Sequence, residues 1–166
     1  MSRMKSIAAA LLIAALAAGA LLSCGSSDPK TLVTEGHTAQ GKGDSKAAEA
    51  KFQEALKSLK PDEPLYVEAR LGIVEAMIAT DAKKAADEFF ALEKTCPGKI
   101  GEKEFLFIGS QMVSAKKYLE AVDLLHQGIQ RAGGKSPTLL VQIDRIKKEA
   151  ASDKAVNDKL HSLGYL

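Results

Sequence analysis

The chain has 166 residues, of which 46% are hydrophobic, 27% charged and 5% aromatic, with no tryptophan. This composition excludes a disordered chain and allows one domain with a single core. The net charge is +2, and Arg3 and Lys5 account for it. The rest of the chain carries 21 basic and 21 acidic residues. This balance argues against a general nucleic-acid binder, which needs a basic surface to release counterions.

The N-terminal segment has the pattern of a targeting signal. Arg3 and Lys5 precede Ile7–Leu22, a run of 16 residues without a polar side chain. This run is shorter than the roughly 20 residues that span a bilayer, and it ends at the motif Leu21-Leu22-Ser23-Cys24. The segment resembles a bacterial lipoprotein signal peptide with its lipobox. An uncleaved signal anchor and ordinary secretory cleavage are the alternatives.

The resemblance implies a signal peptide over residues 1–23 and a mature chain that begins with a lipidated Cys24. Residues 24–30 would then form the lipidated end and a short tether, and residues 31–166 the folded domain. Gly25 follows the cysteine, where the family's inner-membrane retention signal has Asp. We therefore expect an outer-membrane lipoprotein that faces the periplasm and contacts the membrane through its acyl chains.

From Thr31 onward, apolar residues recur every three or four positions, and prolines and glycines fall between the periodic segments. The pattern predicts an all-α domain. Within it, Ser136-Pro137 is typical of a helix start, and Gly41–Asp44 of a turn followed by an N-cap. The expected helices cover residues 31–41, 44–59, 63–79, 82–95, 101–114, 117–132, 136–151 and 153–163.

Cys96 is the only cysteine after Cys24. It has no partner for an intramolecular disulfide, and no histidine lies within twenty residues of it in the sequence. We predict that it is buried; an intermolecular bridge is the alternative. Near the C-terminus, Leu160 and Leu163 are expected to cover the last helix pair, with Gly164 as a left-handed cap.

Small and large residues repeat along the chain every 36 or 37 positions. Each unit would be a helical hairpin in which a glycine of the first helix lets the second helix pack closely. A large apolar residue would fill the space between successive hairpins. The alternative is an irregular helical bundle. The four repeating columns are Gly36/Gly72/Gly109, Ala48/Ala85/Ala121, Phe52/Phe89/Leu125 and Ala55/Leu92/Gly128.

These columns resemble the tetratricopeptide repeat over residues 31–133, with residues 136–163 as a closing helical pair. The resemblance implies a right-handed α-solenoid of about three hairpins whose concave face, built by the first helices, binds a protein partner. The Lys/Asn pattern with which some members hold C-terminal carboxylates is absent. The positions implied for the concave face are Val33, His37, Gln40, Tyr66, Ala69, Ile73, Met77, Lys103, Leu106, Ser110 and Val113.

Other motifs do not support catalysis. The segment Gly36–Gly43 approaches a P-loop, but Gly43 stands where Ser or Thr would hold magnesium. The histidines lack the spacing of metal ligands, and we expect no enzyme activity, metal or cofactor. The sequence thus predicts a membrane-anchored scaffold that recruits a protein partner in the cell envelope. A lipoprotein that binds a small ligand or glycan is the alternative, and the sequence leaves the oligomeric state open.

Overall fold

The computed structural model describes residues 28–166, and Cys24 with the predicted signal peptide lies outside them. The described residues contain eight α-helices and no strand, which confirms the all-α prediction. Every predicted helix is present, with ends that differ by no more than three residues. The helices are α1 (Pro29–Gly41), α2 (Ser45–Leu56), α3 (Pro64–Ile78), α4 (Ala82–Thr95), α5 (Glu102–Ser114), α6 (Tyr118–Arg131), α7 (Pro137–Glu149) and α8 (Lys154–Ser162).

Side-chain caps fix several of the helix starts. The Asp44 carboxylate accepts a hydrogen bond from the Ala47 amide at 3.0 Å and begins α2, directly after Gly43 in the left-handed region. Ser136 caps α7 in the same way, with Pro137 in the first turn. Both local predictions are confirmed. At the other end of α2, the helix stops at Leu56, ahead of Pro61.

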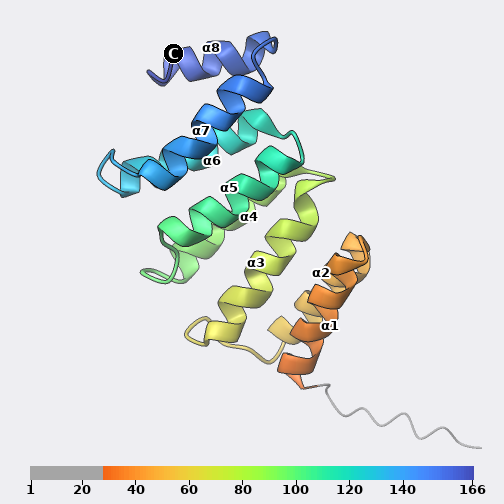
Figure 1. Cartoon of the computed structure of the whole chain (residues 1–166). Coiled ribbons are helices and arrows are strands. Elements are labelled where there is room, and N and C mark those ends of the chain that lie inside the picture. The colour runs from red at the N-terminus through yellow and green to blue at the C-terminus, as the bar shows by residue number, and fades with distance from the viewer. Residues whose placement is uncertain (1–27) are drawn as a thin grey trace, which may run out of the picture.

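The helices stack one after another along an elongated molecule, from the N-terminal pair to α8 (Figure 1). Contacts join helices that are one or two positions apart in the chain: α1 contacts α3, α3 contacts α5 and α5 contacts α7. These odd-numbered helices form one row. The even-numbered helices form a second row, in which α4 contacts α6 and α6 contacts α8. The core runs between these rows, and all members of the alanine and phenylalanine/leucine columns are fully buried in it.

The glycines of the repeat pack against rings and branched side chains. A β-carbon on Gly36 would lie 2.6 Å from the Phe52 ring, and one on Gly109 would lie 2.4 Å from Leu125, as expected within one hairpin. Gly72 differs from the prediction, because it faces Phe52 of the preceding helix pair. Phe52 therefore lies between Gly36 and Gly72 and joins the first two pairs. At this one position, a large residue fills the space between two successive helix pairs, as predicted.

Aromatic rings fill the junction between α4 and α5. The ring centroids of Phe89 and Phe105 are 4.9 Å apart in an edge-to-face arrangement, and Phe90 lies beside them. The Arg131 guanidinium of α6 lies 5.3 Å from the Phe105 centroid and forms an ion pair with Glu93 of α4. Three helices are thereby joined at one point, which the sequence columns did not indicate.

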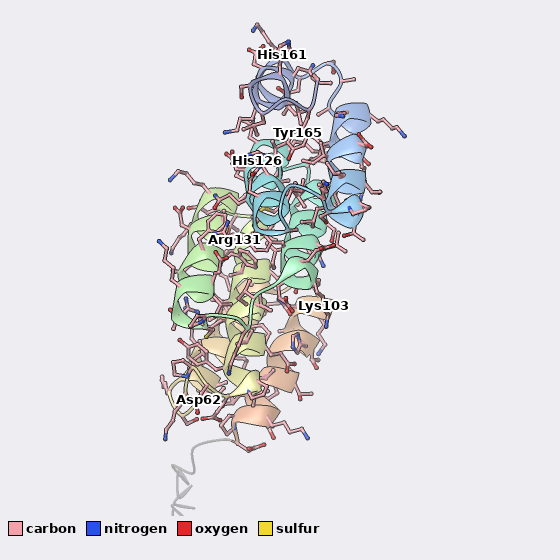
Figure 2. The ribbon with its side chains drawn as sticks, turned by 90° about the vertical axis from the view of Figure 1, so that its left-hand side faces the viewer. Asp62, Lys103, His126, Arg131, His161 and Tyr165 are labelled. Atoms are coloured by element: carbon pink, nitrogen blue, oxygen red, sulfur yellow. The ribbon has the colours of Figure 1, made fainter. Side chains whose placement is uncertain are left out.

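The C-terminal segment closes the stack. Leu160 is fully buried and Leu163 packs partly against the core, as predicted for a closing helix. Gly164 has a φ of 78°, the expected left-handed cap. Tyr165 turns back, and its hydroxyl lies 3.0 Å from Nδ1 of His126, the two side chains meeting near α8 in Figure 2. Cys96 is buried, as predicted, with its thiol 3.4 Å from the Pro61 carbonyl oxygen.

Candidate functional site

Two adjoining hollows of about 260 and 200 Å³ lie where α3 passes between α1 and α5. Glu75 of α3 lines both, so we call the combined feature the Glu75 groove. Side chains from three successive odd-numbered helices therefore border one surface. The first hollow is lined by His37, Glu68, Leu71, Gly72, Glu75, Lys103, Glu104 and Phe107, and the second by Gln40, Ser45, Glu75, Ala76, Ile78, Ala79, Gln111 and Ala115.

Hydrogen bonds from two glutamines hold the Glu75 carboxylate in the middle of the groove. The Gln111 side-chain amide of α5 donates to Oε1 at 3.0 Å, and the Gln40 amide of α1 donates to Oε2 at 3.3 Å. Gln40 also donates to the Gly72 carbonyl oxygen at 2.9 Å. One carboxylate thus links α1, α3 and α5 through neutral donors.

The imidazole of His37 extends this network toward the first hollow. Its Nδ1 lies 3.0 Å from Oε1 of Gln40, and its Nε2 lies 3.0 Å from Oε1 of Glu68. The two ring nitrogens thus join Gln40 of α1 to Glu68 of α3. The ring also meets the edge of Phe52, with centroids 5.1 Å apart. His37 is consequently held in one orientation at the border of the groove.

Burial changes the acidity of the central carboxylate. Glu75 is half-buried, and desolvation raises its pKa above the ordinary value of 4.5. The positive charge of His37 and the hydrogen bond from Gln40 lower the pKa in part. Glu75 is therefore a carboxylate whose charge is costly in the free protein.

The first hollow is mainly apolar apart from its rim. Phe107 of α5 is 40% exposed, and Leu71 of α3 is half-buried beside it. Lys103 and Glu104 stand at the N-terminal end of α5, and Figure 2 places Lys103 on the side where α5 approaches α1. The groove therefore combines an exposed aromatic ring with a central carboxylate.

Three of the residues that the sequence implied for a binding face border this groove: His37, Gln40 and Lys103. Others lie in the core, because their helix faces meet neighbouring helices. Val33, Ala69, Ile73, Met77 and Val113 are buried. Ile73 and Met77 also line a different hollow, formed with α2 and α4.

The remaining implied residues have local partners. The Arg70 guanidinium lies over the Tyr66 ring, 5.9 Å from the ring centroid. Leu106 is half-buried against the core, and the Ser110 hydroxyl donates to the Phe107 carbonyl oxygen at 2.8 Å. These side chains do not border the Glu75 groove.

Four residues of the groove were not predicted from the sequence: Glu68, Glu75, Phe107 and Gln111. A signal for Glu75 was present, since it is the only charged residue in the apolar stretch Leu71–Ile78. A single acid inside an apolar helix is costly to bury and therefore marks a position with a specific environment. The other three residues carry no comparable signal.

Residues 28–166 contain no group of three or more His, Cys, Asp or Glu side chains placed to hold a metal ion. Within the same residues, no helix has both the length and the apolar character needed to cross a membrane. No protein-family model, curated protein or solved structure matches the chain.

Proposed function

We propose that this chain is a non-catalytic docking protein, held at the periplasmic side of the bacterial outer membrane by acyl chains on Cys24. In this proposal the folded domain is a right-handed solenoid of three tetratricopeptide-like hairpins with a closing helix pair. The domain receives a segment of another protein and so recruits it to an envelope complex. The Glu75 groove carries the proposal, because α1, α3 and α5 contribute side chains to one accessible surface.

The packing pattern supports the solenoid. Helices α1, α3, α5 and α7 contact one another in turn, and each helix pair also packs against the next. Gly36 and Gly109 pack against the second helix of their own pairs, and Phe52 also packs against Gly72 of the next pair. Stacked helix pairs of this kind typically offer an extended binding surface along one row of helices.

The resemblance of Leu21-Leu22-Ser23-Cys24 to a lipobox supports the membrane anchor. Such an anchor would favour docking to partners at the membrane. A tethered domain meets membrane partners at a much higher effective concentration than a free one. Substitution Cys24→Ala is expected to leave an unprocessed, unacylated precursor. A fully processed mature protein recovered from that variant would contradict the lipoprotein assignment.

Photocrosslinking in intact cells tests the docking surface. A photoreactive residue replaces Lys103 at the groove, and a second variant carries it at Lys83, an exposed residue of α4 outside the groove. A discrete protein captured from position 103 and not from position 83 is expected. Capture of the same proteins from both positions would contradict docking in the groove.

The small-ligand alternative gives a different outcome in the same cells. A bound glycan or other small ligand would leave position 103 without a protein adduct and would copurify with the domain. Mass spectrometry of the purified, untreated protein under non-denaturing conditions detects such a ligand directly.

A further inference from the structure

We propose that the partner segment carries a lysine or arginine whose cationic group pairs with Glu75, next to an apolar side chain that covers Phe107. This inference rests on the proposed docking function and specifies the chemistry of the occupant. It follows from how the charge of Glu75 is accommodated in the free protein and from the apolar surface beside it.

Glu75 has neutral hydrogen-bond donors but takes part in none of the ion pairs among residues 28–166. The amides of Gln40 and Gln111 occupy one site on each carboxylate oxygen. A carboxylate offers about four acceptor sites, so both oxygens can accept a further donor. The half-buried charge is held in place without being neutralised by a contacting cation.

The position of Glu75 makes that remaining capacity accessible. The residue lines both hollows of the groove, and the exposed side chains of His37 and Lys103 border the first of them. A lysine or arginine side chain lying in either hollow can direct its N–H groups at the carboxylate. The long alkyl part of such a side chain suits a groove with apolar walls.

The other acids of the groove already have partners. Glu68 pairs with His37, and the Glu104 carboxylate accepts a hydrogen bond from the Gly101 amide at 2.9 Å, which caps α5. Lys103 is the one lysine on the rim. The groove thus carries an excess of negative charge, with Glu75 as the acid left for a partner, and this favours a cationic ligand.

The exposed ring of Phe107 supplies the second part of the site. It is 40% exposed and borders the first hollow together with Leu71. An apolar side chain placed on this ring excludes water from the neighbouring ion pair, which strengthens the attraction between its charges. The occupant is therefore a protein segment with a basic residue and an apolar residue close together.

Selection from a displayed library of random twelve-residue peptides tests the inference. The full chain and its Glu75→Gln variant are used as parallel targets. Glu54→Gln is the matched control, since Glu54 is an exposed glutamate of α2 outside the groove. Thermal unfolding of each target confirms that it is folded, and Phe107→Ser provides a second variant at an already exposed position.

The wild-type and Glu54→Gln targets are expected to enrich peptides with Lys or Arg near an aromatic or aliphatic residue. For such a peptide, Glu75→Gln should weaken binding by at least about tenfold, as expected for losing one partner of a partly desolvated charge pair. Phe107→Ser should weaken it as well. If the Glu75→Gln target enriched peptides with Lys or Arg as strongly as the wild type, the inference would be overturned.

Two further outcomes separate this inference from the proposed function. Peptides that bind the groove without any preference for a basic residue would overturn the inference and leave groove docking intact. A library that yields no binder to any target would contradict groove docking itself, and the inference would fall with it.

Discussion

The phenyl ring of Phe52 lies so close to Gly72 that a β-carbon on this glycine would be 2.5 Å from the ring. The ring belongs to α2 and the glycine to α3, so the contact joins two successive helix pairs. On its other side, the same ring packs against Gly36. Two glycines in different pairs therefore make room for one fully buried side chain.

Substitution Gly72→Ala is expected to lower the free energy of unfolding by about 1–3 kcal/mol, because the added methyl group overpacks a buried ring. Gly41→Ala is the control, since a β-carbon there meets no atom within 4 Å. Chemical denaturation of both variants measures the difference. An equal loss in the two variants would show that the contact with Phe52 is not the cause.

Lys116 has a φ of 58°, the left-handed region in which side chains are strained, and it connects α5 to α6. Lys116→Gly should therefore raise the free energy of unfolding by up to about 1 kcal/mol. Lys57, which follows α2, has a right-handed helical backbone conformation. Lys57→Gly should therefore lower the free energy of unfolding. Thermal unfolding of the two variants distinguishes these signs, and destabilisation of Lys116→Gly would contradict the strain argument.

The Arg131 guanidinium donates to Glu93 at 2.7 Å and lies over the rings of Phe105 and Phe90. A lysine keeps the positive charge but lacks the planar guanidinium, which can donate two hydrogen bonds to a carboxylate and stack on aromatic rings. Arg131→Lys should therefore lower the free energy of unfolding by about 1 kcal/mol. Arg145→Lys is the matched control, because Arg145 takes part in an exposed ion pair within α7. This substitution should change the free energy of unfolding by only about 0.3 kcal/mol. Denaturant unfolding compares the two. A similar small effect in both would refute the role of the aromatic contact.

The raised pKa of Glu75 predicts a pH dependence of stability. The folded chain binds the proton more tightly than the unfolded chain, so the cost of the Glu75 charge is present at neutral pH. As the pH falls through the raised pKa toward 4.5, the wild type should gain stability relative to Glu75→Gln. Below that range the difference should stay constant.

Unfolding free energies of the wild type and Glu75→Gln, measured from pH 7 to pH 4, provide the test. The charge of His37 acts on Glu75, so the same pair is compared in a His37→Gln background. A stability difference that is independent of pH in both backgrounds would contradict the assignment to Glu75.

The helices and several turns could be predicted because their signals are local. Asp44 and Ser136 cap their helices through their own side chains. The buried apolar residues of α6 recur with helical spacing and lie on one face of the helix. The face of α3 that borders the Glu75 groove could not be predicted in this way. This helix contacts α1, α2, α4 and α5, so apolar residues surround it and no face stands out. Ile73 and Met77, which the sequence implied on this helix, are buried and do not border the groove.

The contacts between helices one or two positions apart also determine how the chain folds. Such contacts close short loops, and chains dominated by them fold within microseconds to milliseconds. A helix pair can form before the pairs that follow it are complete, because it depends mainly on its immediate neighbours. Hydrogen exchange should consequently be slowest in α3 and α6, each of which contacts four other helices, and fastest in α8 at the end of the stack.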